Sequence, residues 1–224
     1  MPMAALAGNW PNPPHADEYA VSFDSGRAVR LLIVPALFDE ANKLRHFTVE
    51  VMRALDRAGI DAMLPDLPGT NESCEELAGQ SLPSWHAAME AAARHFRATH
   101  LLTMRGGAIC APTGLPCLRY APVSGVKLLR TLLRAQVVSD REAGRDTSRE
   151  QLLENGREDG LALAGYSLSP EMVRQLEDAE LAAQDLPDIA QSELGGPGLW
   201  LRAEPDHDAA QTVALARIVA ERLA

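Results

Sequence analysis

Residues 100–107 read His-Leu-Leu-Thr-Met-Arg-Gly-Gly, a short apolar run that ends in an arginine and two glycines. The run predicts a buried strand, and the glycines predict a sharp turn after it, because glycine adopts backbone conformations that other residues avoid. In some α/β enzymes a turn of this kind presents a nucleophilic serine. Here Arg105 holds the central position. A guanidinium stays protonated and cannot attack a carbonyl carbon, so the sequence predicts the turn without its nucleophile.

Other segments predict strands and helices in alternation around this turn. In chain order we expect strand 29–35, helix 44–58, strand 60–64, helix 84–99, strand 100–104, strand 115–121, helix 128–138, a strand-like run 161–168, helix 170–181, strand 198–203 and helix 209–223. This rhythm predicts parallel pairing, with ligands beyond the carboxyl ends of the strands. The loops 36–45 and 66–73 would meet Arg105 there.

Two polar or proline-rich stretches fall outside this pattern. Gly8–Ala16 contains Asn-Trp-Pro-Asn-Pro-Pro, which we expect to lie extended over the surface without joining a sheet, since proline donates no backbone hydrogen bond. The stretch 139–160 is the candidate for a mobile insertion.

Composition bounds the partners and the cellular setting. The 224 residues suit one α/β domain with a small insertion, and the formal net charge of −10 disfavours nucleic acid and anionic membrane surfaces. Cys74, Cys110 and Cys117 are an odd number without metal-binding spacing, so we expect no disulfide framework, no metal and a reducing cytoplasm. Met1–Ala7 is too short and too poor in basic residues for a signal peptide or a transmembrane segment. No cofactor is indicated, and an oligomer stays open.

Five short segments, in order between about residues 31 and 181, carry a family resemblance. They are 40–45 (Glu-Ala-Asn-Lys-Leu-Arg), 64–69 (Leu-Pro-Asp-Leu-Pro-Gly), 104–108 (Met-Arg-Gly-Gly-Ala), 122–127 (Pro-Val-Ser-Gly-Val-Lys) and 163–170 (Leu-Ala-Gly-Tyr-Ser-Leu-Ser-Pro). Together they resemble the α/β-hydrolase-fold proteins called hydrolase 2 that accompany exosortase A systems. That family also carries arginine at the turn. This chain departs from it at 70–73, where Thr-Asn-Glu-Ser replaces the family's Gly-Asp-Ser.

The resemblance implies a fold and a functional setting. The fold is an α/β-hydrolase-like three-layer sandwich with a mostly parallel sheet and a reduced helical cap. The expected divisions are an extended segment 1–28, a core of 29–125 and 182–224, and a small cap of 126–181. The setting is an exosortase or exopolysaccharide export system, with an acyl or anionic small molecule or an export-pathway protein as partner.

Arg105 is the first candidate binding residue, because a guanidinium on a tight turn is costly to bury without an anionic partner. The partner is either an internal carboxylate, from Asp39, Glu40 or Asp66, or a ligand, and the sequence leaves both open.

Lys43, Arg45 and Asp66 are further candidate binding residues. Lys43 and Arg45 could share an anion pocket with Arg105, although a solvated helix entry explains both more simply. Asp66 could serve the same site, although its Asp-Leu-Pro-Gly context first indicates a turn.

His207 and Ser124 are the candidate catalytic pair, and Ser73 is a second choice of nucleophile. A displaced serine served by a histidine would make the chain an active esterase or thioesterase. The simpler alternative is that His207 only precedes a helix capped by Asp208 and that Ser124 forms a turn. We favour a catalytically degenerate hydrolase fold, and the alternatives are an active esterase and a pure interaction module.

Overall fold

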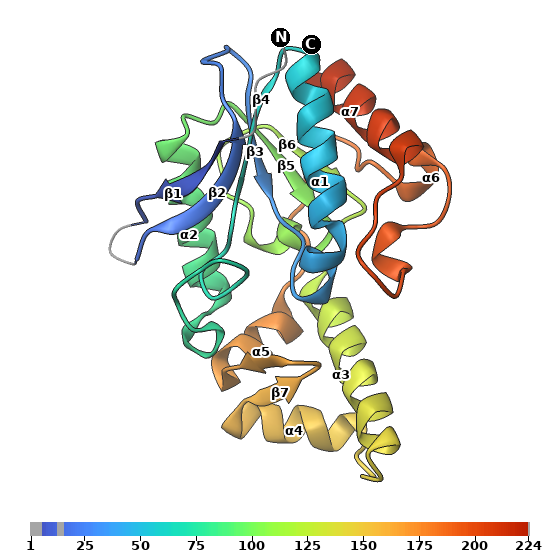
Figure 1. The fold of residues 1–224 in the computed structure, drawn as a ribbon. Helices are drawn as coiled ribbons and strands as arrows, with labels where there is room; N and C mark the ends of the chain where they lie inside the picture. Colours follow the sequence, from blue (N-terminus) through green and yellow to red (C-terminus); the bar gives the residue numbers. More distant parts are fainter. Residues whose placement is uncertain (1–5, 13–15, 224) are drawn as a thin grey trace.

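The structure, a computed structural model, describes residues 6–12 and 16–223. Its centre is a six-stranded sheet in the order β1-β2-β4-β3-β5-β6 (Figure 1). The strands are β1 (Leu6–Trp10), β2 (Glu18–Phe23), β3 (Arg30–Val34), β4 (Asp61–Pro65), β5 (His100–Met104) and β6 (Cys117–Tyr120). Strands β4, β3, β5 and β6 pair in parallel, and β2 and β1 extend the β4 edge in antiparallel fashion. The predicted mostly parallel sheet is confirmed.

Helices lie on both faces of this sheet, and further helices lie outside it (Figure 1). The long ones are α1 (Asp39–Arg57), α2 (Leu82–His95), α3 (Gly125–Glu142), α4 (Arg149–Asp159), α5 (Pro170–Asp178) and α7 (Ala209–Leu223); the short ones are α6 (Gln191–Leu194) and the 3₁₀ turns η1 (Leu77–Gly79), η2 (Arg105–Cys110) and η3 (Leu199–Leu201). Leu31 and Ile33 of β3 pack with α1 and α7, whereas Leu32 and Val34 pack with α2. This alternation buries both faces, as expected for a parallel sheet.

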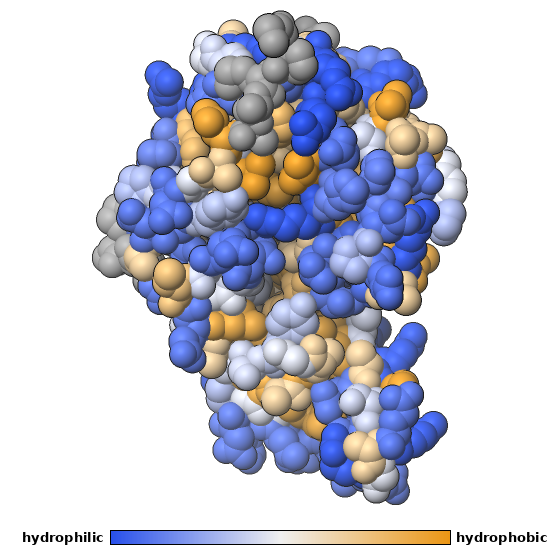
Figure 2. Space-filling model, in the orientation of Figure 1, coloured by the Kyte–Doolittle hydropathy of each residue, from blue (hydrophilic) through white to orange (hydrophobic). Residues whose placement is uncertain are grey.

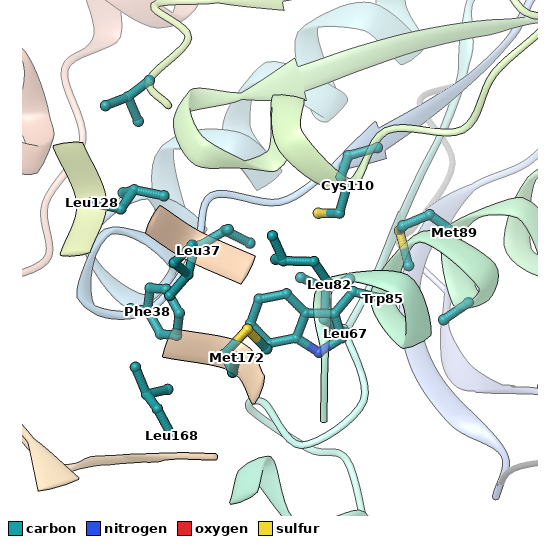
Figure 3. Packing of buried hydrophobic residues seen from close by; sticks show 14 of the residues in the cluster. Leu37, Phe38, Leu67, Leu82, Trp85, Met89, Cys110, Leu128, Leu168 and Met172 are labelled. Atoms are coloured by element: carbon teal, nitrogen blue, oxygen red, sulfur yellow. The ribbon is translucent and has the colours of Figure 1, made fainter. Parts of the chain in front are cut away.

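The segment from α3 to α5 forms a separate group below the sheet in the view of Figure 1. It includes the small hairpin of β7 (Leu161–Leu163) and β8 (Tyr166–Leu168). Its apolar side chains, among them Leu128, Leu168 and Met172, join the core cluster that contains Leu37 and Phe38 of the β3–α1 loop (Figure 3). Burial of these side chains therefore ties the helical group to the loop that follows β3.

Several local predictions differ from the structure. Gly8–Ala16 was expected outside any sheet, but β1 pairs with β2 from Leu6↔Ser22 to Trp10↔Glu18, because β2 offers a complete ladder of partners. Strand β2 itself was not predicted. The stretch 139–160 contains the end of α3 and the whole of α4, where the Ser148 hydroxyl accepts from the Gln151 amide as an N-cap, and its mobility stays a prediction.

Two further predictions need correction. The run 161–168 is a hairpin of two short strands and not one. The last predicted strand, 198–203, forms the 3₁₀ turn η3, and at the edge of β6 it is Ile189 that makes a parallel bridge, with Tyr120.

Most of Met1–Ala7, and residues 13–15 within the proline-rich stretch, lie outside the described residues. Within the described ranges, no helix is both long enough and apolar enough to cross a bilayer. On the face drawn in Figure 2, hydrophilic residues dominate, and smaller hydrophobic patches lie between them.

Candidate functional site

Arg105 follows the last residue of β5 and begins η2. Its φ of 52° lies in the left-handed region, which is strained for a residue with a side chain. A Cβ atom on Gly107 would overlap the carbonyl oxygen of Pro35, so the turn closes against the β3–α1 loop only because residue 107 is glycine. The sharp strand-to-helix turn expected from the sequence is thus present, with an arginine at its centre.

The guanidinium of Arg105 is held on three sides. Nε donates to Oε2 of Glu40 at 3.1 Å and Nη2 donates to Oε1 at 2.9 Å, a two-point pair with one carboxylate. Nη1 donates to the carbonyl oxygen of Ala121 at 2.8 Å. The guanidinium carbon lies 3.8 Å from the ring centroid of Trp200, in a cation–π contact. The side chains of Arg105 and Glu40 are only 14% and 15% exposed, so solvent screens this pair weakly.

A cavity of about 200 Å³ adjoins this ion pair. Its lining is mainly apolar and includes two ion pairs; the lining residues are Leu37, Phe38, Asp39, Glu40, Lys43, Arg105, Leu128, Thr131, Leu132, Trp200 and Leu201. Lys43, one of the predicted binding residues, lies here, and its Nζ pairs with Oδ2 of Asp39 at 2.7 Å. No histidine, serine or cysteine is among the described residues that line the cavity.

Arg45 and Asp66 lie apart from this cavity and bind each other. Nη1 of Arg45 lies 2.5 Å from Oδ1 of Asp66, whose side chain has no exposure. Asp66 also accepts a hydrogen bond from Nδ2 of Asn71 at 3.1 Å and one from the amide of Glu72 at 3.4 Å. The structure therefore brings Lys43 to Arg105, but not Arg45 or Asp66.

His207 does not meet a serine. Its ring lies against that of His46, with centroids 4.4 Å apart, and its backbone amide donates to Asp206 at 2.7 Å. Asp208 accepts from the amides of Ala210 and Gln211, each at 3.0 Å, as an N-cap of α7. The histidine thus stands in the helix-entry setting that the simpler interpretation describes.

Ser124 and Ser73 are likewise engaged in local structure. Ser124 precedes α3, is 5% exposed and lies under its first turn, where its carbonyl accepts from the Leu128 amide at 3.1 Å. The Ser73 hydroxyl donates to Glu18 at 3.0 Å and accepts from the Gly69 amide at 2.9 Å. Across residues 6–12 and 16–223, no hydrogen bond joins either serine to a histidine.

Cys110 and Cys117 are buried thiols, and the described residues hold no candidate metal site. Burial raises the pKa of the Cys110 thiol to about 12 and that of Cys117 to about 11, so neither forms a nucleophilic thiolate readily. No three His, Cys, Asp or Glu side chains among the described residues gather closely enough to hold a metal ion.

Two residues of the site escaped the sequence analysis. Trp200 was placed in a strand, and nothing local indicates that η3 folds its ring over Arg105. Ala121 contributes only a backbone carbonyl, which no side-chain pattern reveals.

No family profile and no curated protein matches the sequence. Solved structures do match the fold. Alpha/beta hydrolase domain-containing protein 10 from mouse is 12% identical with a TM-score of 0.60, and the match covers 98% of each chain. A putative hydrolase from Agrobacterium vitis is 12% identical with a TM-score of 0.52, covering 80% of this chain and 72% of that one.

A proline iminopeptidase-related protein from Thermus thermophilus is 18% identical with a TM-score of 0.47, and this chain spans 57% of its length. At these identities the mouse and Agrobacterium proteins establish the fold alone: the chain has the α/β-hydrolase fold, with a mostly parallel sheet flanked by helices.

Proposed function

We propose that this chain is a catalytically degenerate α/β-hydrolase-fold protein that binds a small acyl molecule without hydrolysing it. The observation that carries the proposal is the state of Arg105. It stands at the strained turn after β5, where this fold presents its nucleophile, and its guanidinium is committed to Glu40, Ala121 and Trp200.

The lining of the cavity supports binding of an acyl chain. Leu37, Phe38, Leu128 and Leu132 offer apolar surface, and a small number of polar groups, among them Arg105 and Lys43, complete the lining. Small-molecule sites usually combine such an apolar wall with a few convergent polar groups. The volume of about 200 Å³ is below the roughly 300–1,000 Å³ of drug-sized sites, which favours a short chain.

The same lining argues against turnover. Acyl transfer by this fold needs a nucleophile, a base within hydrogen-bond reach of it, and an acid that orients the base. The described residues around the cavity supply neither a hydroxyl at the turn nor an imidazole. We therefore expect a bound ligand to dissociate from the cavity without being hydrolysed.

Binding is tested with the fluorescence of Trp200, which lines the cavity, whereas Trp10 and Trp85 are fully buried and are not among the lining residues. We expect methyl hexanoate to change the emission saturably. Thr131→Phe narrows the cavity and should weaken binding at least tenfold. Val138→Phe adds the same ring to the same helix at a 52% exposed position outside the cavity, and should bind normally. Equal binding by both variants would contradict the proposal.

Hydrolysis is tested with p-nitrophenyl hexanoate. The wild-type chain, Ser124→Ala and His207→Ala should release nitrophenol no faster than buffer. Hydrolysis by the wild type that disappears in His207→Ala would instead establish the active esterase with a displaced nucleophile.

We also propose that the chain serves an exosortase or exopolysaccharide export system. The support is the resemblance of its ordered motifs, together with the direct contacts between them, Glu40 with Arg105 and Arg45 with Asp66. Deleting the gene in its native host should impair exopolysaccharide export or protein sorting. Normal export in the deletion strain would contradict this assignment.

A further inference from the structure

Glu40 makes with Arg105 the contact that a ligand carboxylate would make. Its two oxygens accept from Nε and Nη2 at 3.1 and 2.9 Å, and paired hydrogen bonds of this kind are the preferred geometry between arginine and a carboxylate. Glu40 also lines the cavity. In the cavity where we propose that a ligand binds, the Glu40 carboxylate therefore occupies the position on Arg105 that a ligand carboxylate would take.

Arg105 has two contacts besides Glu40 that hold its guanidinium. The carbonyl oxygen of Ala121 accepts from Nη1 at 2.8 Å, and the Trp200 ring covers the face of the guanidinium at 3.8 Å. These two contacts leave Nε and Nη2 directed at the position that the Glu40 carboxylate occupies, here called the seat. If Glu40 left, the guanidinium would still present the same two donors to an incoming anion.

Glu40 has a second cation within reach. It lies in the first turn of α1, and Lys43 follows three residues later, a spacing that brings side chains together on a helix. Lys43 lines the same cavity and now pairs with Asp39, whose side chain is 55% exposed and can be solvated by water. A displaced Glu40 could thus exchange Arg105 for Lys43 without leaving a carboxylate unpaired in the cavity.

We propose that Glu40 acts as a latch, that is, an internal carboxylate that a ligand can displace from Arg105. The ligand of the cavity would be a short-chain monocarboxylate whose head group takes the place of Glu40 on Arg105. The inference rests on the proposed binding function and names its ligand class. Exchange of one carboxylate for another keeps the buried guanidinium neutralised, whereas a neutral head group would leave it without a counter-charge. An ester can therefore enter only the apolar part of the cavity.

The decisive experiment compares hexanoate with methyl hexanoate on the full chain. Glu40→Gln keeps the shape of the latch but removes its charge, so hexanoate should bind at least tenfold more tightly than to the wild type, with methyl hexanoate unchanged. Lys43→Gln leaves the pair of Arg105 and Glu40 intact but removes the alternative cation. This variant should bind hexanoate several-fold more weakly than the wild type.

A rescue experiment covers the case in which Glu40→Gln is too unstable to titrate. In Glu40→Ala the seat is empty, and hexanoate should raise the melting temperature by several degrees more than methyl hexanoate does. Asp188→Ala is the matched control, because Arg119 is 13% exposed and loses its carboxylate, but neither residue lines the cavity. Hexanoate should not stabilise this control preferentially.

The proposal that Glu40 is displaced would be overturned if hexanoate bound Glu40→Gln no more tightly than the wild type. It would also be overturned if hexanoate stabilised both alanine variants equally. Failure of both hexanoate and methyl hexanoate to bind any variant would instead contradict the proposed binding function.

Discussion

Arg45 and Asp66 form an ion pair in which Nη1 and Oδ1 lie 2.5 Å apart, and the Asp66 carboxylate has no solvent exposure. The pair joins α1 to the turn after β4. Arg45 and Asp66, two of the predicted binding residues, therefore pair with each other, and we expect the pair to stabilise the fold.

Arg45→Met should destabilise the fold by about 2 kcal/mol, because Asp66 would keep only its bonds from Asn71 and Glu72. Urea unfolding measures the change. Arg217→Met removes an ion pair in which both side chains are about 60% exposed, and should cost less than about 0.5 kcal/mol. Similar losses in the two variants would show that the buried pair has no special role.

Glu18 should make stability fall as pH rises through the neutral range. Its side chain is fully buried, Ser73 donates to Oε1 at 3.0 Å, and Oε2 has no partner. Burial raises the pKa of Glu18 from 4.5 to about 7, so the folded chain keeps a proton that the unfolded chain releases. This contribution is complete below pH 4.5 and is lost as pH approaches and passes 7, a change of up to about 3 kcal/mol.

Glu18→Gln imitates the protonated acid and should flatten this dependence. Unfolding in urea at pH 5 and pH 8 should show the variant gaining stability relative to the wild type at pH 8. An exposed exchange, Glu221→Gln, should leave the wild-type difference between the two pH values intact. A slope that survives Glu18→Gln would rule out Glu18 as its source.

Gly107→Ala should destabilise the fold by about 3 kcal/mol, because the added methyl group meets the carbonyl oxygen of Pro35 and neither backbone can move freely. Gly79→Ala, where a Cβ has open space and φ is not positive, should change stability by less than about 1 kcal/mol. Thermal melting of both variants compares them directly, and equal melting temperatures would contradict the close approach.

Arg105→Ser should not create an esterase. The new hydroxyl would stand at the turn, but no histidine lines the cavity within the described chain, and the His207 ring lies against His46. Nitrophenyl ester hydrolysis by a variant with an unchanged circular dichroism spectrum is the measurement. Hydrolysis well above that of the wild type would reveal a base that the geometry does not provide.

Elements with strong local signals were predictable. The strand 100–104 and the helix 209–223 agree with β5 and α7 in both bounds, because an apolar run before a glycine turn and an apolar-periodic run after a capping aspartate are local features. Strands β1 and β2 were missed because they are stabilised by each other and by β4 and not by their own pattern.

By itself, the sequence determined the alternating α/β order and the sharp turn with a non-nucleophilic arginine at its centre. It also offered three carboxylates as internal partners of that arginine, with a ligand as the open alternative. Only the tertiary structure divided them: Glu40 binds Arg105, Asp39 binds Lys43 and Asp66 binds Arg45. The reason is physical. Strand and turn preferences act between neighbours in the chain, whereas an ion pair across 65 residues depends on how β3, α1 and β5 pack.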